Sequence, residues 1–108
     1  MKTTSYILLI VFIFITHITH AQLDIVKNKT TYPFWIHVPV AENEVKQPLL
    51  LFLHGKSLSG TDLKKVKRYG VLRAMEKGRK IPAIVVGPQL VSGGWNPDEV
   101  LELIEYLK

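Results

Sequence analysis

The chain has 108 residues and no cysteine, and its 14 basic and 9 acidic residues give a formal charge of +5 at pH 7. A chain of this length forms one domain at most, and the lack of cysteine excludes disulfide scaffolds and thiolate metal sites. The histidines and carboxylates do not recur at metal-ligand spacing, so we expect no metal and no other cofactor.

The first 21 residues have the pattern of an export signal. Lys2 supplies a positive charge, residues 6–15 form an apolar run, and Ala21 ends a small-residue cleavage pattern. The run is shorter than the roughly 20 apolar residues that a spanning helix needs, so we expect no stable membrane insertion. We therefore expect a signal peptide at 1–21 and a domain at 22–108 that is exported to the periplasm or the cell exterior. An uncleaved membrane anchor is the alternative.

Two segments precede the most apolar part of the expected domain. Residues 24–30 are polar with two apolar side chains, whereas residues 32–39 largely alternate and are rich in aromatic and β-branched residues. The second pattern is typical of a strand. Pro33 and Pro39 confine this strand to a sheet edge or limit its length, because proline has no N–H to donate. A charged connector follows at residues 41–47.

Residues 48–55 are the stretch around which the chain is predicted to be organised. Five large apolar residues, 49–53, leave no polar face, so we predict a strand that is buried on both sides, as in a parallel sheet covered by helices. His54 and Gly55 then end the run, and glycine can adopt backbone angles that bring the chain close to a ligand. Ligands bind outside the carboxyl ends of parallel strands, so this turn is expected to carry chemistry.

A helical pattern extends from Asp62 to Gly78, with Thr61 or Asp62 as its N-cap. Gly70 would cost about 1 kcal/mol in a helix interior, so two short helices that meet near it fit as well as one. Basic residues fill the polar face: Lys64, Lys65, Lys67, Arg68, Arg73, Lys77, Arg79 and Lys80. No aromatic residues are interleaved to stack on bases, so we interpret this face as solvated and expect no nucleic-acid binding.

Residues 81–88 form a second apolar, β-branched run that is predicted to be another buried parallel strand. After a glycine-rich loop, Pro97 in the first turn and the acids at 98 and 99 predict the start of a helix. The apolar face of this helix is predicted to comprise Val100, Leu101, Ile104 and Leu107. The order of the elements predicts an α/β fold with a mostly parallel sheet flanked by helices.

The motifs, taken in order, resemble the amino-terminal part of an α/β-hydrolase. The closer resemblance is to secreted bacterial esterases of the prolyl-oligopeptidase-like and phospholipase/carboxylesterase-like groups. It covers about residues 32–108 and rests on the His54-Gly55 strand end, Lys-Arg-Tyr-Gly at 67–70, Pro88-Gln89 and Gly-Gly-Trp-Asn-Pro at 93–97. The resemblance implies a partial α/β-hydrolase fold and an exported serine hydrolase that acts on a small-molecule carboxylic ester.

The resemblance also implies roles for the residues after the predicted strand. The backbone N–H of Lys56 would be a donor in an oxyanion hole, beside Gly55. Many relatives have a second glycine where this chain has Ser57, which is a departure from the family pattern. His54 is interpreted as an organiser of the loop rather than as a proton carrier.

Ser57, Trp95 and Asn96 are candidates for the border of a substrate cleft. Core packing for Trp95 and capping of the last helix for Asn96 are the alternatives. A local pair of His54 with Ser57 or Ser59 has little support, because neither serine lies in a strand-turn-helix elbow.

The chain contains no Gly-x-Ser-x-Gly nucleophile turn, so the resemblance implies an amino-terminal portion that is inactive alone. Two alternatives remain open. The first is the peptidase branch of the same fold, and the second is a non-catalytic exported binding module that uses the basic face. The sequence makes no prediction of oligomeric state.

Overall fold

The computed structural model describes residues 22–40 and 46–108, so the expected signal peptide and most of the charged connector lie outside the described residues. The strands are β1 (Asp24–Val26), β2 (Phe34–His37), β3 (Leu49–Leu51) and β4 (Ile84–Pro88). The helices are the 3₁₀ helices η1 (Lys56–Leu58) and η2 (Leu63–Arg68) and the α-helices α2 (Gly70–Glu76) and α3 (Pro97–Tyr106). Within the described residues, no helix has the length and apolar character needed to cross a membrane.

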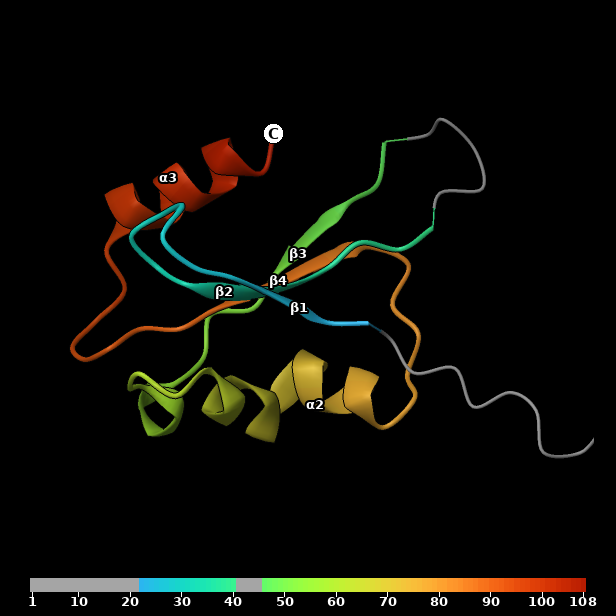
Figure 1. The fold of residues 1–108 in the computed structure, drawn as a ribbon, viewed down its shortest axis with the longest axis horizontal. Coiled ribbons are helices and arrows are strands. Elements are labelled where there is room, and N and C mark those ends of the chain that lie inside the picture. Colours follow the sequence, from blue (N-terminus) through green and yellow to red (C-terminus); the bar gives the residue numbers. More distant parts are fainter. Residues whose placement is uncertain (1–21, 41–45) are drawn as a thin grey trace, which may run out of the picture.

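The four strands form one mixed sheet in the order β1-β2-β4-β3 (Figure 1). β1 pairs antiparallel with β2, β2 pairs antiparallel with β4, and β3 and β4 are parallel. The predicted fold class, a partial α/β-hydrolase fold with a mostly parallel sheet flanked by helices, is therefore wrong. Residues 27–33 join β1 to β2, and so short a connection suits an antiparallel pair, because a parallel pair needs a crossover of about a dozen residues or more.

β3 lies at the edge of the sheet, which corrects the prediction of a doubly buried central strand. Leu49 and Leu50 are each 40% exposed and Leu53 is 41% exposed. The covered apolar strand is β4, in which Val85 and Val86 are fully buried. Both runs are apolar enough for a central strand, and hydrophobic pattern alone does not show which one has a neighbour on each side.

β2 is an interior strand, between β1 and β4. Of the two predicted effects of Pro33 and Pro39, the limit on strand length is the one observed, since β2 has four residues. Both prolines flank the strand, so their missing N–H groups do not interrupt its hydrogen bonds to either neighbour.

Helices lie on both sides of the sheet, with α3 on one side and η2 and α2 on the other (Figure 1). Successive side chains of a strand point to opposite faces, so each strand contributes to two cores. Trp35 and Val85 belong to the core under η2 and α2. Phe34 and Val86 belong to the core under α3, together with Leu103. Two small cores therefore share one sheet.

Gly70 divides the helical stretch into two, which is one of the two arrangements that the sequence left open. Tyr69 is extended between η2 and α2, and Gly70 begins α2 with a φ of +74°. A Cβ atom at Gly70 would lie 2.7 Å from Cζ of Phe52, so the space and the backbone angle both require glycine. Of the two predicted candidates, Asp62 is the N-cap of η2, because its carboxylate accepts a hydrogen bond from the backbone N–H of Lys64 at 3.1 Å.

α3 begins where the sequence predicts, and its buried face matches the predicted one in part, since Leu107 packs against the core under α3. Asn96 is its N-cap, and the side-chain Oδ1 accepts a hydrogen bond from the backbone N–H of Asp98 at 2.9 Å. Leu103 is fully buried although the predicted apolar face omitted it, whereas Leu101 is exposed. Leu103 lies about one turn from Val100 and so shares its face, while Leu101 lies about 100° round the helix.

Candidate functional site

The candidate site lies at the carboxyl ends of the parallel strands β3 and β4. Beyond β3, the backbone N–H of Phe52 still donates to the Val86 carbonyl at 2.9 Å, so the two chain segments stay paired to their ends. The chain that leaves β3 forms residues 54–60, here called the donor loop, and the chain that leaves β4 forms residues 89–96, here called the support loop. Both loops therefore start at the carboxyl ends of these two parallel strands, which is the end at which α/β sheets commonly bind ligands.

His54 joins the two loops. The residue is 3% exposed, and its Nε2 atom accepts a hydrogen bond from the backbone N–H of Leu90 at 3.0 Å. An accepting Nε2 carries no proton, so the ring proton is on Nδ1, which donates to the Gly55 carbonyl at 2.7 Å. Both ring nitrogens are thus engaged with the backbone. The ring cannot take a proton from a neighbouring serine without losing the hydrogen bond from Leu90.

Gln89 is a second organising residue, to which the sequence analysis gave no role in the site. Its buried Nε2 atom donates to the Leu58 carbonyl at 3.1 Å and to the Asp62 carbonyl at 2.7 Å. The backbone adds a hydrogen bond from the Gly60 N–H to the Leu90 carbonyl at 3.0 Å. Burying a polar amide costs free energy unless the amide is hydrogen-bonded. The position of Gln89 directly after a buried strand is therefore the sequence signal that could have identified it as an organising residue.

Trp95 packs the support loop against the donor loop. Its Nε1 atom donates to the His54 carbonyl at 3.1 Å, and its ring meets the His54 ring edge to face at a centroid distance of 4.9 Å. On another side it meets the ring of Tyr32 at 5.1 Å. The backbone N–H of Asn96 donates to the Tyr32 hydroxyl at 2.9 Å. The structure thus uses Asn96 as a cap and the Trp95 ring for packing, while Trp95 as a residue is half-buried.

Gly55, Lys56 and Ser57 form the exposed tip of the donor loop. Gly55 has a φ of −82° and a ψ of 177°, an extended conformation open to any residue, so the turn does not use the additional backbone angles that glycine can adopt. η1 begins at Lys56, and the first N–H groups of a helical turn have no partner inside it. Among the described residues, the backbone N–H groups of Lys56 and Ser57 have no acceptor. Two donors are therefore available to an outside acceptor.

An open groove of about 540 Å³ starts beside the donor loop. It is lined by Leu53, Trp95, Pro97, Asp98, Val100, Leu101 and Ile104. Trp95 is hydrogen-bonded to the His54 carbonyl. The Trp95 end of the groove is therefore adjacent to His54, two residues before the free N–H of Lys56. Apart from Asp98 the lining is apolar or aromatic, which suits an aliphatic or acyl group.

Neither serine hydroxyl, of Ser57 or of Ser59, is hydrogen-bonded to His54 in the described part of the chain. Ser57 lies in η1, and the Oγ atom of Ser59 is buried without a described hydrogen-bond partner. The two ring nitrogens of His54 are occupied, so the local serine–histidine pair has no geometric support. In the ranges 22–40 and 46–108, no cluster of three His, Asp or Glu side chains could hold a metal ion.

Burial raises the pKa of the Tyr32 hydroxyl above its usual value of 10.0, and the nearby carboxylate of Glu99 raises it further, against the opposing hydrogen bond from Asn96. The unfolded chain therefore releases this proton at a lower pH than the folded chain. The contribution to stability is fully present below pH 10 and is lost as the pH rises through the raised pKa.

We expect Tyr32→Phe to be less stable than the wild type at neutral pH, because the Asn96 N–H loses its acceptor. The difference should narrow above pH 10, where only the wild type has a Tyr32 proton to lose. Thermal unfolding of both proteins, followed by circular dichroism across this pH range, measures the difference. A difference that stays constant with pH would contradict the linkage.

Comparison with protein-family models and with curated proteins gives no match to this chain. The hydrolase resemblance therefore stays a prediction from the motifs.

Proposed function

We propose that this chain is part of an exported serine hydrolase that cleaves carboxylic esters, and that its donor loop binds the oxyanion. The observation that supports the proposal is the pair of exposed backbone donors at Lys56 and Ser57 on an otherwise hydrogen-bonded loop. In acyl transfer, negative charge develops on the carbonyl oxygen of the substrate, and fixed N–H donors stabilise that charge.

His54 acts on this site as a positioning residue. The Gly55 carbonyl accepts hydrogen bonds from His54 Nδ1 at 2.7 Å and from the Leu58 N–H at 3.1 Å. The C=O of Gly55 and the N–H of Lys56 belong to one planar trans peptide, in which they point in opposite directions. Fixing the carbonyl therefore fixes the direction of the Lys56 donor, away from the His54 ring. A donor that is oriented before the substrate binds needs no reorganisation during the reaction.

The neighbouring groove supports an ester rather than a peptide as the substrate. Most of its lining is apolar, and Asp98 is the one charged side chain that it contains. A bound peptide would need hydrogen-bonding partners for its main chain, whereas an acyl group or an alkyl alcohol needs mainly apolar contact. The groove thus favours an ester with an aliphatic part over the peptidase alternative.

The nucleophile of the proposed reaction is not Ser57 or Ser59. We expect the purified chain to hydrolyse p-nitrophenyl acetate no faster than the Ser57→Ala and Ser59→Ala variants do, because His54 is not free to act as a base. Release of p-nitrophenol measures the rates. Turnover by the wild type that disappears in Ser57→Ala alone would identify Ser57 as the nucleophile and overturn the assignment of this loop to oxyanion binding.

A further inference from the structure

The two outer layers of the fold carry opposite charges. Residues 63–80 contain eight basic residues and one acidic residue, a formal charge of +7. On α3 and the residues after it, the charged side chains are Asp98, Glu99, Glu102, Glu105 and Lys108. η2 and α2 lie on one side of the sheet and α3 lies on the other (Figure 1). The molecule therefore has a positive layer at 63–80 and a negative layer at 97–108.

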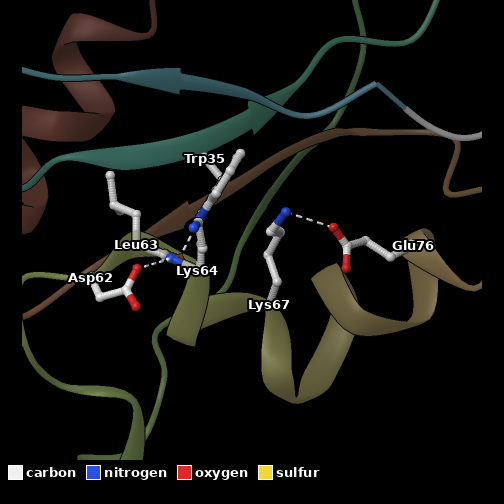
Figure 2. Close-up of polar contacts among 6 residues, drawn as sticks. All are labelled: Trp35, Asp62, Leu63, Lys64, Lys67 and Glu76. Carbon is white, nitrogen blue, oxygen red and sulfur yellow. Dashed lines mark hydrogen bonds and ion pairs between the residues drawn. The ribbon is translucent and has the colours of Figure 1, made fainter.

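Only part of the positive layer is neutralised within the fold. Lys67 pairs with Glu76 at 2.7 Å, and its Nζ atom lies 4.2 Å from the centroid of the Trp35 ring (Figure 2). Lys65 Nζ donates to the Ser59 carbonyl at 3.1 Å. The remaining six basic residues are exposed, and among the described residues none has an acidic partner: Lys64, Arg68, Arg73, Lys77, Arg79 and Lys80.

The outer side of the positive layer is free to contact a partner, because its apolar side is already packed against the sheet. The buried side chains of η2 and α2 are Leu63, Val66, Leu72 and Met75, and all four pack into the core under the sheet. A concentration of like charges is electrostatically unfavourable unless it meets the opposite charge. The layer therefore has the properties of a contact face for an anionic surface that does not insert apolar residues.

We propose that the positive layer docks peripherally onto anionic phospholipid headgroups, with the negative layer of α3 turned away from the bilayer. The charge separation across the sheet would orient the whole domain on such a surface, since each basic residue near it contributes about 1 kcal/mol. Tyr69, at 63% exposure between η2 and α2, lies within the positive layer. Tyrosine is enriched at membrane interfaces, where its ring meets the headgroups. This proposal does not depend on the ester-hydrolase proposal.

A nucleic acid carries the same phosphate chemistry, but the structure favours lipid. Proteins that bind single strands combine basic side chains with several aromatic platforms on which bases stack. In residues 63–80, Tyr69 is the single aromatic residue. One aromatic side chain among many cations suits a headgroup surface better than a run of stacked bases.

The test is cosedimentation of the full chain with vesicles that contain phosphatidylglycerol in phosphatidylcholine. One triple variant, Lys64→Gln/Arg68→Gln/Lys77→Gln, removes three charges from the positive layer. A matched triple, Lys27→Gln/Lys29→Gln/Lys46→Gln, removes three exposed charges elsewhere. We expect the first triple to bind about 100-fold more weakly than the wild type and the second less than about 10-fold more weakly. Circular dichroism checks that both variants stay folded.

Three outcomes would overturn the proposal. Equal weakening by both triples would show that net charge alone matters. Equally tight binding of the wild type to pure phosphatidylcholine vesicles would show that headgroup charge does not matter, and the apolar amino-terminal segment, which all three proteins share, would account for that binding. Binding of a single-stranded oligonucleotide at physiological salt that the first triple loses, with unchanged binding to vesicles, would assign the layer to nucleic acid.

Discussion

Replacing His54 by alanine is expected to lower the free energy of unfolding by about 2–4 kcal/mol. The change removes the acceptor of the buried Leu90 N–H, the donor to the Gly55 carbonyl and the ring against which Trp95 packs. A buried N–H without a partner costs about 1–3 kcal/mol by itself, and the lost packing adds to this. Urea denaturation followed by circular dichroism measures the change.

His37→Ala is the matched control for this variant. His37 is partly exposed on β2, and its Nδ1 atom lies 2.9 Å from the Gln22 carbonyl near the start of the described chain. We expect this variant to lose less than about 1 kcal/mol. His54→Ala should also speed hydrogen exchange at the Leu58 N–H, because the donor loop is loosened. Equal losses of stability in the two variants would remove His54 from its organising role.

Replacing Lys56 by proline is expected to remove a donor from the proposed oxyanion site while the fold is kept. Position 56 begins η1, where the missing N–H and fixed φ of proline are tolerated. Gly55 is extended, which is the conformation that the residue before a proline prefers. Affinity for an alkylphosphonate, whose anionic oxygens resemble those of an acyl-transfer intermediate, should fall at least about 10-fold, because a hydrogen bond to a charged acceptor contributes about 1.5–3 kcal/mol.

Lys56→Ala is the control, because it keeps the backbone N–H and removes the side-chain charge. At physiological ionic strength an exposed lysine adds little to the binding of a small anion, so isothermal titration should give nearly the wild-type affinity. If the alanine variant loses as much affinity as the proline variant, the ligand is held by the charge of Lys56 and not by its backbone.

The local features of the fold could be predicted because they depend on neighbouring residues. Asp62, one of two cap candidates, and Asn96, for which capping was one of two interpretations, cap their helices, and Gly70 interrupts the helical stretch. The sheet could not be predicted in the same way. β2 pairs antiparallel with β4, through partners such as Phe34 and Pro88, and this long-range pairing leaves β3 at the edge. No local pattern in either strand contains that information.

The candidate site likewise has features that could be predicted from the sequence and features that could not. The position of His54 at the end of an apolar run was enough to single out the donor loop. Besides His54, the residues whose side chains brace the two loops were not recognised, because their contacts are distant in sequence. Gln89 bonds Asp62 across 27 residues, and Tyr32 meets Asn96 across 64 residues.

The availability of the Lys56 and Ser57 donors is tested most directly by an NMR titration of the ¹⁵N-labelled chain with an alkylphosphonate. We predict that the largest shifts occur at the backbone amides of Lys56 and Ser57, and that the indole N–H of Trp95 also shifts as the alkyl chain enters the groove. Shifts confined to the positive layer of η2 and α2, with none at Lys56 or Ser57, would contradict the oxyanion-binding role of the donor loop.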